Sequence, residues 1–104
     1  MLNIHTEETP DGFVICRPVG ELDAFTVSQF RQALADLASS KRLIIDMSGI
    51  PFVDSAGLGA LMLVQRKAAE RRLTVCLRGA NEELRFLLVL TKLDDLFELE
   101  TGVA

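Results

Sequence analysis

The stretch Asp46–Leu58 has the sequence DMSGIPFVDSAGL and joins the short apolar run Leu43–Ile45 to an amphipathic segment that continues to about Arg72. It contains two carboxylates, two hydroxyl groups, two glycines and one proline. A buried strand that leads through a polar turn into the start of a helix is where α/β proteins place their functional sites. We therefore expect the function of the protein to depend on this stretch.

The length and composition are those of a small globular domain. The chain has 104 residues, of which 49% are hydrophobic and 25% charged, so we expect a single domain over residues 1–104. Such a chain buries about two-thirds of its unfolded surface, enough for one core and one site but not for a large catalytic cavity. The net charge is −4 and no basic face is evident, which argues against nucleic acid as a partner.

The sequence also predicts a cytoplasmic protein without a membrane partner. Its first residues lack the basic start and long apolar run of a signal peptide, and the longest nearly uncharged stretch, residues 56–65, is too short to cross a bilayer. Cys16 and Cys76 lie in apolar, strand-like runs and form no C-x-x-C pair. We expect both to be buried free thiols.

The N-terminal segment has the pattern of a hairpin. Residues 2–6 alternate between apolar and polar, as a half-exposed edge strand does, and residues 13–18 are more uniformly apolar. Residues 10–12, with the sequence PDG, predict the turn between them. His5, the only histidine, is expected on the polar face of the edge strand.

Helices alternate with strands from residue 24 onward. Thr26-x-x-Gln29 resembles a capping box that opens a first helix, and residues 42–47 read as a third strand. Residues 73–78 alternate as a fourth strand, and Asn81 is a plausible N-cap for the next helix. With a last strand at the C-terminal end, the pattern predicts an α/β fold. We expect a mixed β-sheet of about five strands with helices packed on it.

The helix expected from about Ala56 has an apolar stripe on one side and an outer face next to the polar turn on the other. A helical wheel places Gln65 within an apolar stripe, so it must either find a buried hydrogen-bond partner or lie in a tilted, exposed part of the helix. The wheel puts Gly59, Ala60 and Leu63 on the outer face beside Ser55. An apolar spot next to a polar turn hints at a docking surface.

Ser55 can be interpreted first as a nucleophile. A strand, a turn and a serine at a helix start resemble the elbow of a serine hydrolase. The elbow requires glycine two residues before the serine, where this chain has Val53, and its histidine base has no counterpart except His5 on the edge strand. We therefore disfavour a hydrolase.

Two other interpretations of the turn remain open on chemistry alone. Asp23, Asp46 and Asp54 could lie on adjacent loops and hold Mg²⁺, although an Asp or Ser at a helix start is more often a cap. Ser55 could instead accept a phosphate, which would meet the positive end of a helix and add about −1.5 to −2 charges near Asp54. A partner docked over this turn would feel that charge directly.

Residues 20–24 (GELDA) and 45–59 (IDMSGIPFVDSAGLG) resemble the two signature segments of the STAS domain, and residues 93–97 (LDDLF) resemble a weaker third segment. The resemblance is strongest to the bacterial anti-sigma factor antagonists. It implies that Ser55 is phosphorylated by an anti-sigma factor that is itself a serine kinase. The unmodified protein would bind this partner and free a sigma factor, phosphorylation would abolish binding, and a phosphatase would reset the switch.

The resemblance implies a regulatory protein without catalytic residues, cofactor or metal, so we expect no enzyme. The implied partner-binding residues are Gly20, Glu21, Asp23, Asp54, Ser55, Ala56, Gly57, Gly59, Ala60 and Leu63. The alternative within the family is a STAS scaffold that binds without being switched, in a signalling or transport complex.

The chain departs from the family pattern at several positions. Many relatives have Ser or Thr where Ala56 stands, so Ser55 is expected to be the only phosphate acceptor in the turn. Gln65 replaces an apolar residue, and Arg71–Arg72 and Lys92 stand where helix-ending glycines are common. We expect the C-terminal helix of the family to be short or absent.

Overall fold

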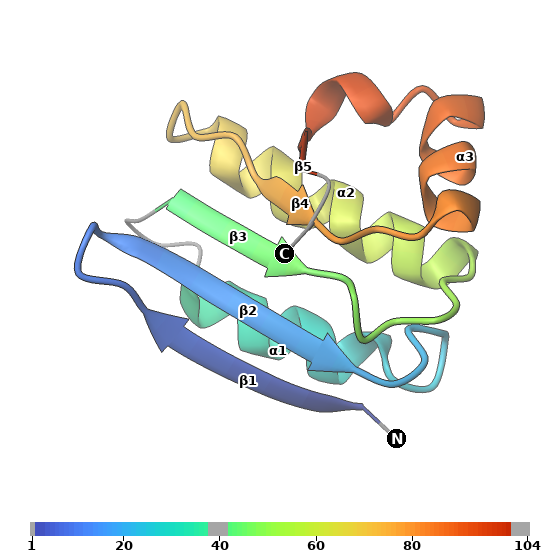
Figure 1. Cartoon of the computed structure of the whole chain (residues 1–104), viewed down its shortest axis with the longest axis horizontal. Helices are drawn as coiled ribbons and strands as arrows, with labels where there is room; N and C mark the ends of the chain where they lie inside the picture. Colours follow the sequence, from blue (N-terminus) through green and yellow to red (C-terminus); the bar gives the residue numbers. More distant parts are fainter. Residues whose placement is uncertain (1, 38–41, 101–104) are drawn as a thin grey trace.

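The computed structural model describes residues 2–37 and 42–100 of the chain. Figure 1 shows the order of the elements along the chain. They are β1 (Asn3–Glu8), β2 (Phe13–Val19), α1 (Val27–Leu37), β3 (Arg42–Asp46), α2 (Ser55–Ala69), β4 (Cys76–Arg78), α3 (Glu82–Leu90), the 3₁₀ turn η1 (Asp94–Leu96) and β5 (Glu98–Glu100). No helix within the described ranges is long and apolar enough to cross a membrane.

The strands form one mixed sheet in the order β1-β2-β3-β4-β5. β1 pairs antiparallel with β2 as a hairpin, whereas β2, β3, β4 and β5 pair in parallel with their neighbours. The predicted fold class, the five-stranded mixed sheet and the N-terminal hairpin are therefore confirmed.

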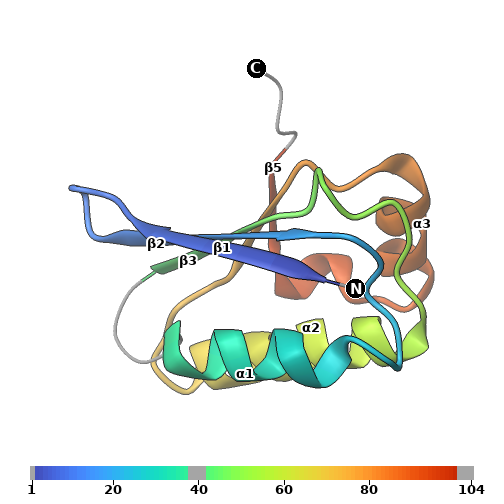
Figure 2. The same cartoon turned by 90° about the horizontal axis from the view of Figure 1, so that it is seen from below.

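Helices α1 and α2 lie side by side on one face of this sheet (Figure 2). Because side chains alternate along a strand, Cys16 and Ile45 face the helices in the main core, whereas Ile15, Ile44 and Cys76 form a small second cluster on the other face. Both cysteines are free and buried, as predicted, and burial raises the pKa of each thiol to about 11. Their positions on opposite faces exclude a disulfide between them.

The first helix begins where predicted, but the capping box is wrong. The Gln29 amide donates to the carbonyl oxygen of Leu2 at 2.7 Å instead of reaching back to Thr26. The Thr26 hydroxyl donates to the Glu21 carbonyl at 2.8 Å and accepts from the Asp23 amide. Thr26 therefore stabilises the loop before the helix rather than the helix amides.

The fourth strand is shorter than predicted, because only Cys76–Arg78 pairs in the sheet. The Val75 amide donates instead to Oε1 of the buried Gln65, at 2.9 Å. Of the two possibilities for Gln65, the buried hydrogen-bond partner is confirmed. This bond joins the end of α2 to the start of β4.

Two helices end at a positively charged residue in the left-handed conformation. Arg72 has φ 59° and Lys92 has φ 60°. After α3, the Lys92 amide donates to the Val89 carbonyl and the Leu93 amide to the Leu88 carbonyl, which is the Schellman pattern. The sequence had marked both positions as ones where glycine is common. The predicted Asn81 cap of α3 is also confirmed, since Oδ1 accepts from the Leu84 amide at 2.8 Å.

We predict that Arg72→Gly stabilises the protein by about 1 kcal/mol, because glycine adopts a positive φ without the penalty of a side chain. Glu70→Gly is the control: Glu70 has φ −59°, so glycine there should lose up to about 1 kcal/mol. Urea unfolding measures both free energies. A loss of stability in Arg72→Gly would contradict the assigned backbone conformation.

Candidate functional site

Two loops meet at the carboxyl end of the parallel strands. Loop A, residues 20–26, follows β2, and loop B, residues 47–54, follows β3; both lie at the right-hand end of Figure 1. The Gly20 amide donates to the Gly49 carbonyl at 3.0 Å, and Gly20 has φ 129°, a region that favours glycine. The pairing of β2 with β3 therefore continues beyond the sheet.

Leu22 forms the centre of this junction. Its amide donates to the Phe52 carbonyl at 3.2 Å, and its own carbonyl accepts from the Asp54 amide at 3.2 Å. Its side chain is completely buried, and an isolated parallel bridge links it to Val53. A Cβ atom at Gly57 would lie 2.7 Å from Val53 Cγ1 and 2.8 Å from the Leu22 carbonyl oxygen. Glycine is therefore required for the first turn of α2 to pack against both loops.

The carboxylate of Asp54 joins the start of α2 to loop A. Oδ1 accepts from the Gly57 amide at 3.0 Å and caps the helix, while Oδ2 accepts from the Ala24 amide at 3.2 Å. The capping interpretation of Asp54 is thus confirmed. One side chain fixes both the helix that starts at Ser55 and the loop that carries Asp23.

The tip of loop A is held by a second carboxylate. Asp23 Oδ1 accepts from the amides of Phe25 at 2.9 Å and Thr26 at 3.1 Å. Thr26 is buried and bonded to Glu21 and Asp23 as described above. These bonds fix the backbone of the tip, so its side chains project in defined directions.

Ser55 is the first residue of α2, and its side chain is exposed. Because Asp54 provides the cap, the Ser55 hydroxyl is not needed to satisfy the helix end. The other serine of this stretch, Ser48, donates its hydroxyl to Asp46 Oδ1 at 2.7 Å. The structure thus presents Ser55 to solvent beside a carboxylate and at the positive end of a helix.

The outer face of α2 differs from the helical wheel at one predicted position. Ala60 is only 2% exposed and lies in the core, so its assignment to the outer face is wrong. Gly57, predicted to contact a partner, is also buried. Because residues 57 and 60 are small, α2 packs closely against α1 and loop A. The buried face of α2 therefore includes residues 57, 60, 61 and 64. Gly59 borders open space and Leu63 is 36% exposed, so both remain accessible.

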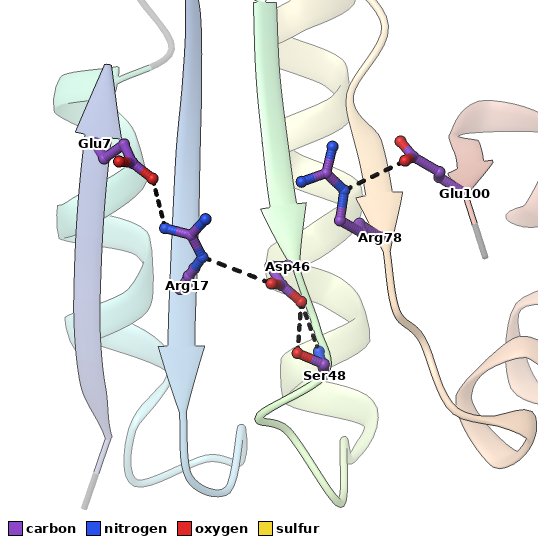
Figure 3. A network of polar contacts seen from close by, with 6 residues as sticks. All are labelled: Glu7, Arg17, Asp46, Ser48, Arg78 and Glu100. Atoms are coloured by element: carbon purple, nitrogen blue, oxygen red, sulfur yellow. Dashed lines mark hydrogen bonds and ion pairs between the residues drawn. The ribbon is translucent and has the colours of Figure 1, made fainter. Parts of the chain in front are cut away.

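The three carboxylates considered for Mg²⁺ do not converge. Asp46 lies instead on the face of the sheet opposite α1 and α2, where Oδ1 accepts from Ser48 and Oδ2 lies 3.7 Å from Arg17 Nε (Figure 3). Asp23 and Asp54 are both occupied by backbone amides. Among the described residues, no group of three or more His, Cys, Asp or Glu side chains is placed to hold a metal ion.

The geometry gives no support to a hydrolase. His5 lies in the middle of β1, paired in register with Arg17, and neither loop at Ser55 contains a histidine. Val53 is buried at the position where the hydrolase elbow requires glycine.

Phe25, whose side chain is 94% exposed at the tip of loop A, is not among the residues predicted from the sequence. One signal was available. Phe25 lies outside the apolar stripe of the following helix, which Val27, Phe30 and Leu34 begin, so the core had no place for its ring. The bond between Asp54 and Ala24 was also missed, because it joins residues 30 positions apart.

Comparisons with known proteins agree on the fold. The family model described as "STAS domain" matches residues 4–104. An anti-sigma-B factor antagonist of Listeria monocytogenes is 25% identical over 101 residues, covering 95% of this chain and 89% of the relative. The crystal structure of an anti-sigma factor antagonist from Mycobacterium paratuberculosis superposes with a TM-score of 0.80 at 26% identity, covering 96% and 86% of the two chains. The phosphorylated form of the Bacillus cell fate determinant SpoIIAA superposes with a TM-score of 0.75 at 20% identity, covering 95% and 92%.

Gly57 and Gly59 form a matched pair for testing the packing of α2. We predict that Gly57→Ala destabilises the protein by about 2–3 kcal/mol, because its Cβ would clash with Val53 and the Leu22 carbonyl. Gly59→Ala should stabilise it by about 0.5–1 kcal/mol, since no atom lies within 4 Å of the added Cβ and alanine favours the helix. Urea unfolding compares the two. Equal effects would mean that α2 does not pack as described.

Asp54 and Ser55 should differ sharply in their structural importance. We predict that Asp54→Ala lowers the free energy of unfolding by about 1–2 kcal/mol, because the variant loses the helix cap and the bond to Ala24. Ser55→Ala should change it by less than about 0.5 kcal/mol, because the hydroxyl is exposed. A larger loss in Ser55→Ala than in Asp54→Ala would show that Ser55 is the structural residue.

Proposed function

Because the chain belongs to the STAS domain family, we propose that it acts as an anti-sigma factor antagonist that is switched by phosphorylation of Ser55. The unphosphorylated protein binds an anti-sigma factor that is also a serine kinase and thereby frees a sigma factor. Phosphorylation at Ser55 ends the association, and a phosphatase restores it. The protein itself catalyses no reaction in this scheme.

The observation that carries the proposal is the exposed Ser55 hydroxyl on a rigid support. Asp54 caps α2 and bonds to loop A, so the serine needs no movement of the fold to reach a kinase. The names of relatives from Listeria and Mycobacterium as anti-sigma factor antagonists, and the phosphorylated form recorded for SpoIIAA, support the same function.

A phosphate on Ser55 has opposite effects on the fold and on binding. In the free protein it meets the positive end of α2, which offsets its repulsion from Asp54, so the fold persists. Under a docked partner the same charge loses its water, and burying a charge without a partner costs several kcal/mol. Each 1.4 kcal/mol is a factor of ten in affinity, so binding falls by orders of magnitude.

The partner surface on this chain is smaller than the sequence suggested. We propose that it comprises the accessible predicted residues Gly20, Glu21, Asp23, Asp54, Ser55, Ala56, Gly59 and Leu63. Gly57 and Ala60 contribute only packing beneath it.

Incubation with the source organism's anti-sigma factor kinase and ATP should add one phosphate, which mass spectrometry maps to Ser55. Ser55→Ala should remain unmodified, whereas Ser48→Ala, in the same stretch, should still take up one phosphate. In calorimetric titrations Ser55→Ala should bind as the wild type does, and Ser55→Asp at least about 100-fold more weakly.

Absence of modification by every such kinase, together with unaltered binding of Ser55→Asp, would refute the proposal. Equal binding of Ser55→Ala, Ser55→Asp and the wild type, with a partner present, would instead favour a scaffold that binds without being switched.

A further inference from the structure

Phe25 is the most exposed large apolar side chain among the described residues, with 94% of its surface open to solvent. Its ring makes no contribution to the core, yet its backbone is held by hydrogen bonds. The Phe25 amide donates to Asp23 Oδ1, and both neighbouring amides are bonded as well, Ala24 to Asp54 and Thr26 to Asp23. The loop therefore fixes the backbone that carries this solvent-exposed ring.

An exposed ring on a fixed backbone is suited to binding. Aromatic side chains bury a large apolar area at a small cost in conformational entropy, and they are common among the residues that dominate interface energies. Fixing the backbone beforehand reduces the entropy that is lost when a partner binds. The Ala24 amide donates to Asp54. Phe25 follows Ala24 and Ser55 follows Asp54 in the chain, so this hydrogen bond brings the two residues close together.

The charge around Phe25 restricts the class of partner. Loop A (residues 20–26) and loop B (residues 47–54) contain three carboxylates, Glu21, Asp23 and Asp54, and no lysine or arginine. An anionic membrane surface or a nucleic acid would be repelled here, and a second copy of the same surface would bring like charges together. A protein surface with an apolar pocket and basic edges complements both the ring and its surroundings.

We propose that Phe25 is the apolar anchor of the docking surface around Ser55, and that it enters an apolar pocket edged by basic side chains on the anti-sigma factor. This inference rests on the proposed function, since the occupant is the partner named there. Asp23, Thr26 and Asp54 act as positioning residues for the ring, and Glu21 supplies charge beside it.

The test measures binding of purified anti-sigma factor kinases of the source organism to the wild type, Phe25→Ala and Phe86→Ala by surface plasmon resonance. Phe86, in α3, is the control because it is also a largely exposed phenylalanine, at 62%. Phe25→Ala should weaken binding by at least about 30-fold, as loss of an interface hot spot does, and Phe86→Ala by less than about 3-fold. All three proteins should unfold at the same temperature, because neither ring is packed in the core.

A second pair of variants tests whether the partner's pocket has a basic edge. Glu21→Gln should slow association and reduce its dependence on salt, whereas Glu70→Gln, at the far end of α2, should do neither. An unchanged association rate of Glu21→Gln would contradict the proposal that the pocket has a basic edge.

The two proposals fail in different ways. If the wild type binds a kinase and Phe25→Ala binds it within about 3-fold, or if Phe86→Ala is equally impaired, the Phe25 anchor is overturned and the proposed function stands. If the wild type binds none of the kinases, the proposed function falls and the anchor falls with it.

Discussion

The candidate functional site depends on the pairing of Leu22 with loop B. Two backbone hydrogen bonds connect Leu22 to Phe52 and Asp54, and its buried side chain contacts the space that Gly57 leaves open. This junction extends the parallel pairing of β2 and β3 into two loops that would otherwise be independent. Asp54 then has a fixed position from which one carboxylate reaches both α2 and loop A. The orientation of Ser55 follows from that position.

A junction of this kind suits a switch that acts on a partner rather than on the fold. The structural tasks at the start of α2 are performed by Asp54 and Gly57, which leaves the Ser55 hydroxyl available for chemistry. In the proposed switch, a phosphate on Ser55 would change the charge of the surface while the supporting contacts persist. Loop A supplies the apolar part of the proposed docking surface, because Asp23 fixes the backbone that carries the exposed Phe25.

The sequence predicted the features that depend on near neighbours in the chain. Alternation predicted the hairpin, the helix-cap rule predicted the role of Asn81, and the strand–turn–helix pattern predicted that Ser55 is accessible at the start of a helix. It failed where distant segments decide the outcome. The helical wheel placed Ala60 on the outer face, yet its small side chain is what allows α2 to pack closely there. The fourth strand starts later than predicted, because the Val75 amide donates to Gln65 instead of to a neighbouring strand.

The central claim is that loop A and the start of α2 form one docking surface that a single phosphate closes, and hydrogen–deuterium exchange with the purified anti-sigma factor kinase tests it most directly. Binding of the unmodified protein should protect amides in residues 20–26 and 55–63, with no added protection in β1. Stoichiometric phosphorylation at Ser55 should abolish that protection without altering exchange of the sheet in the free protein. Protection centred on other elements, or protection that persists after phosphorylation, would contradict the account.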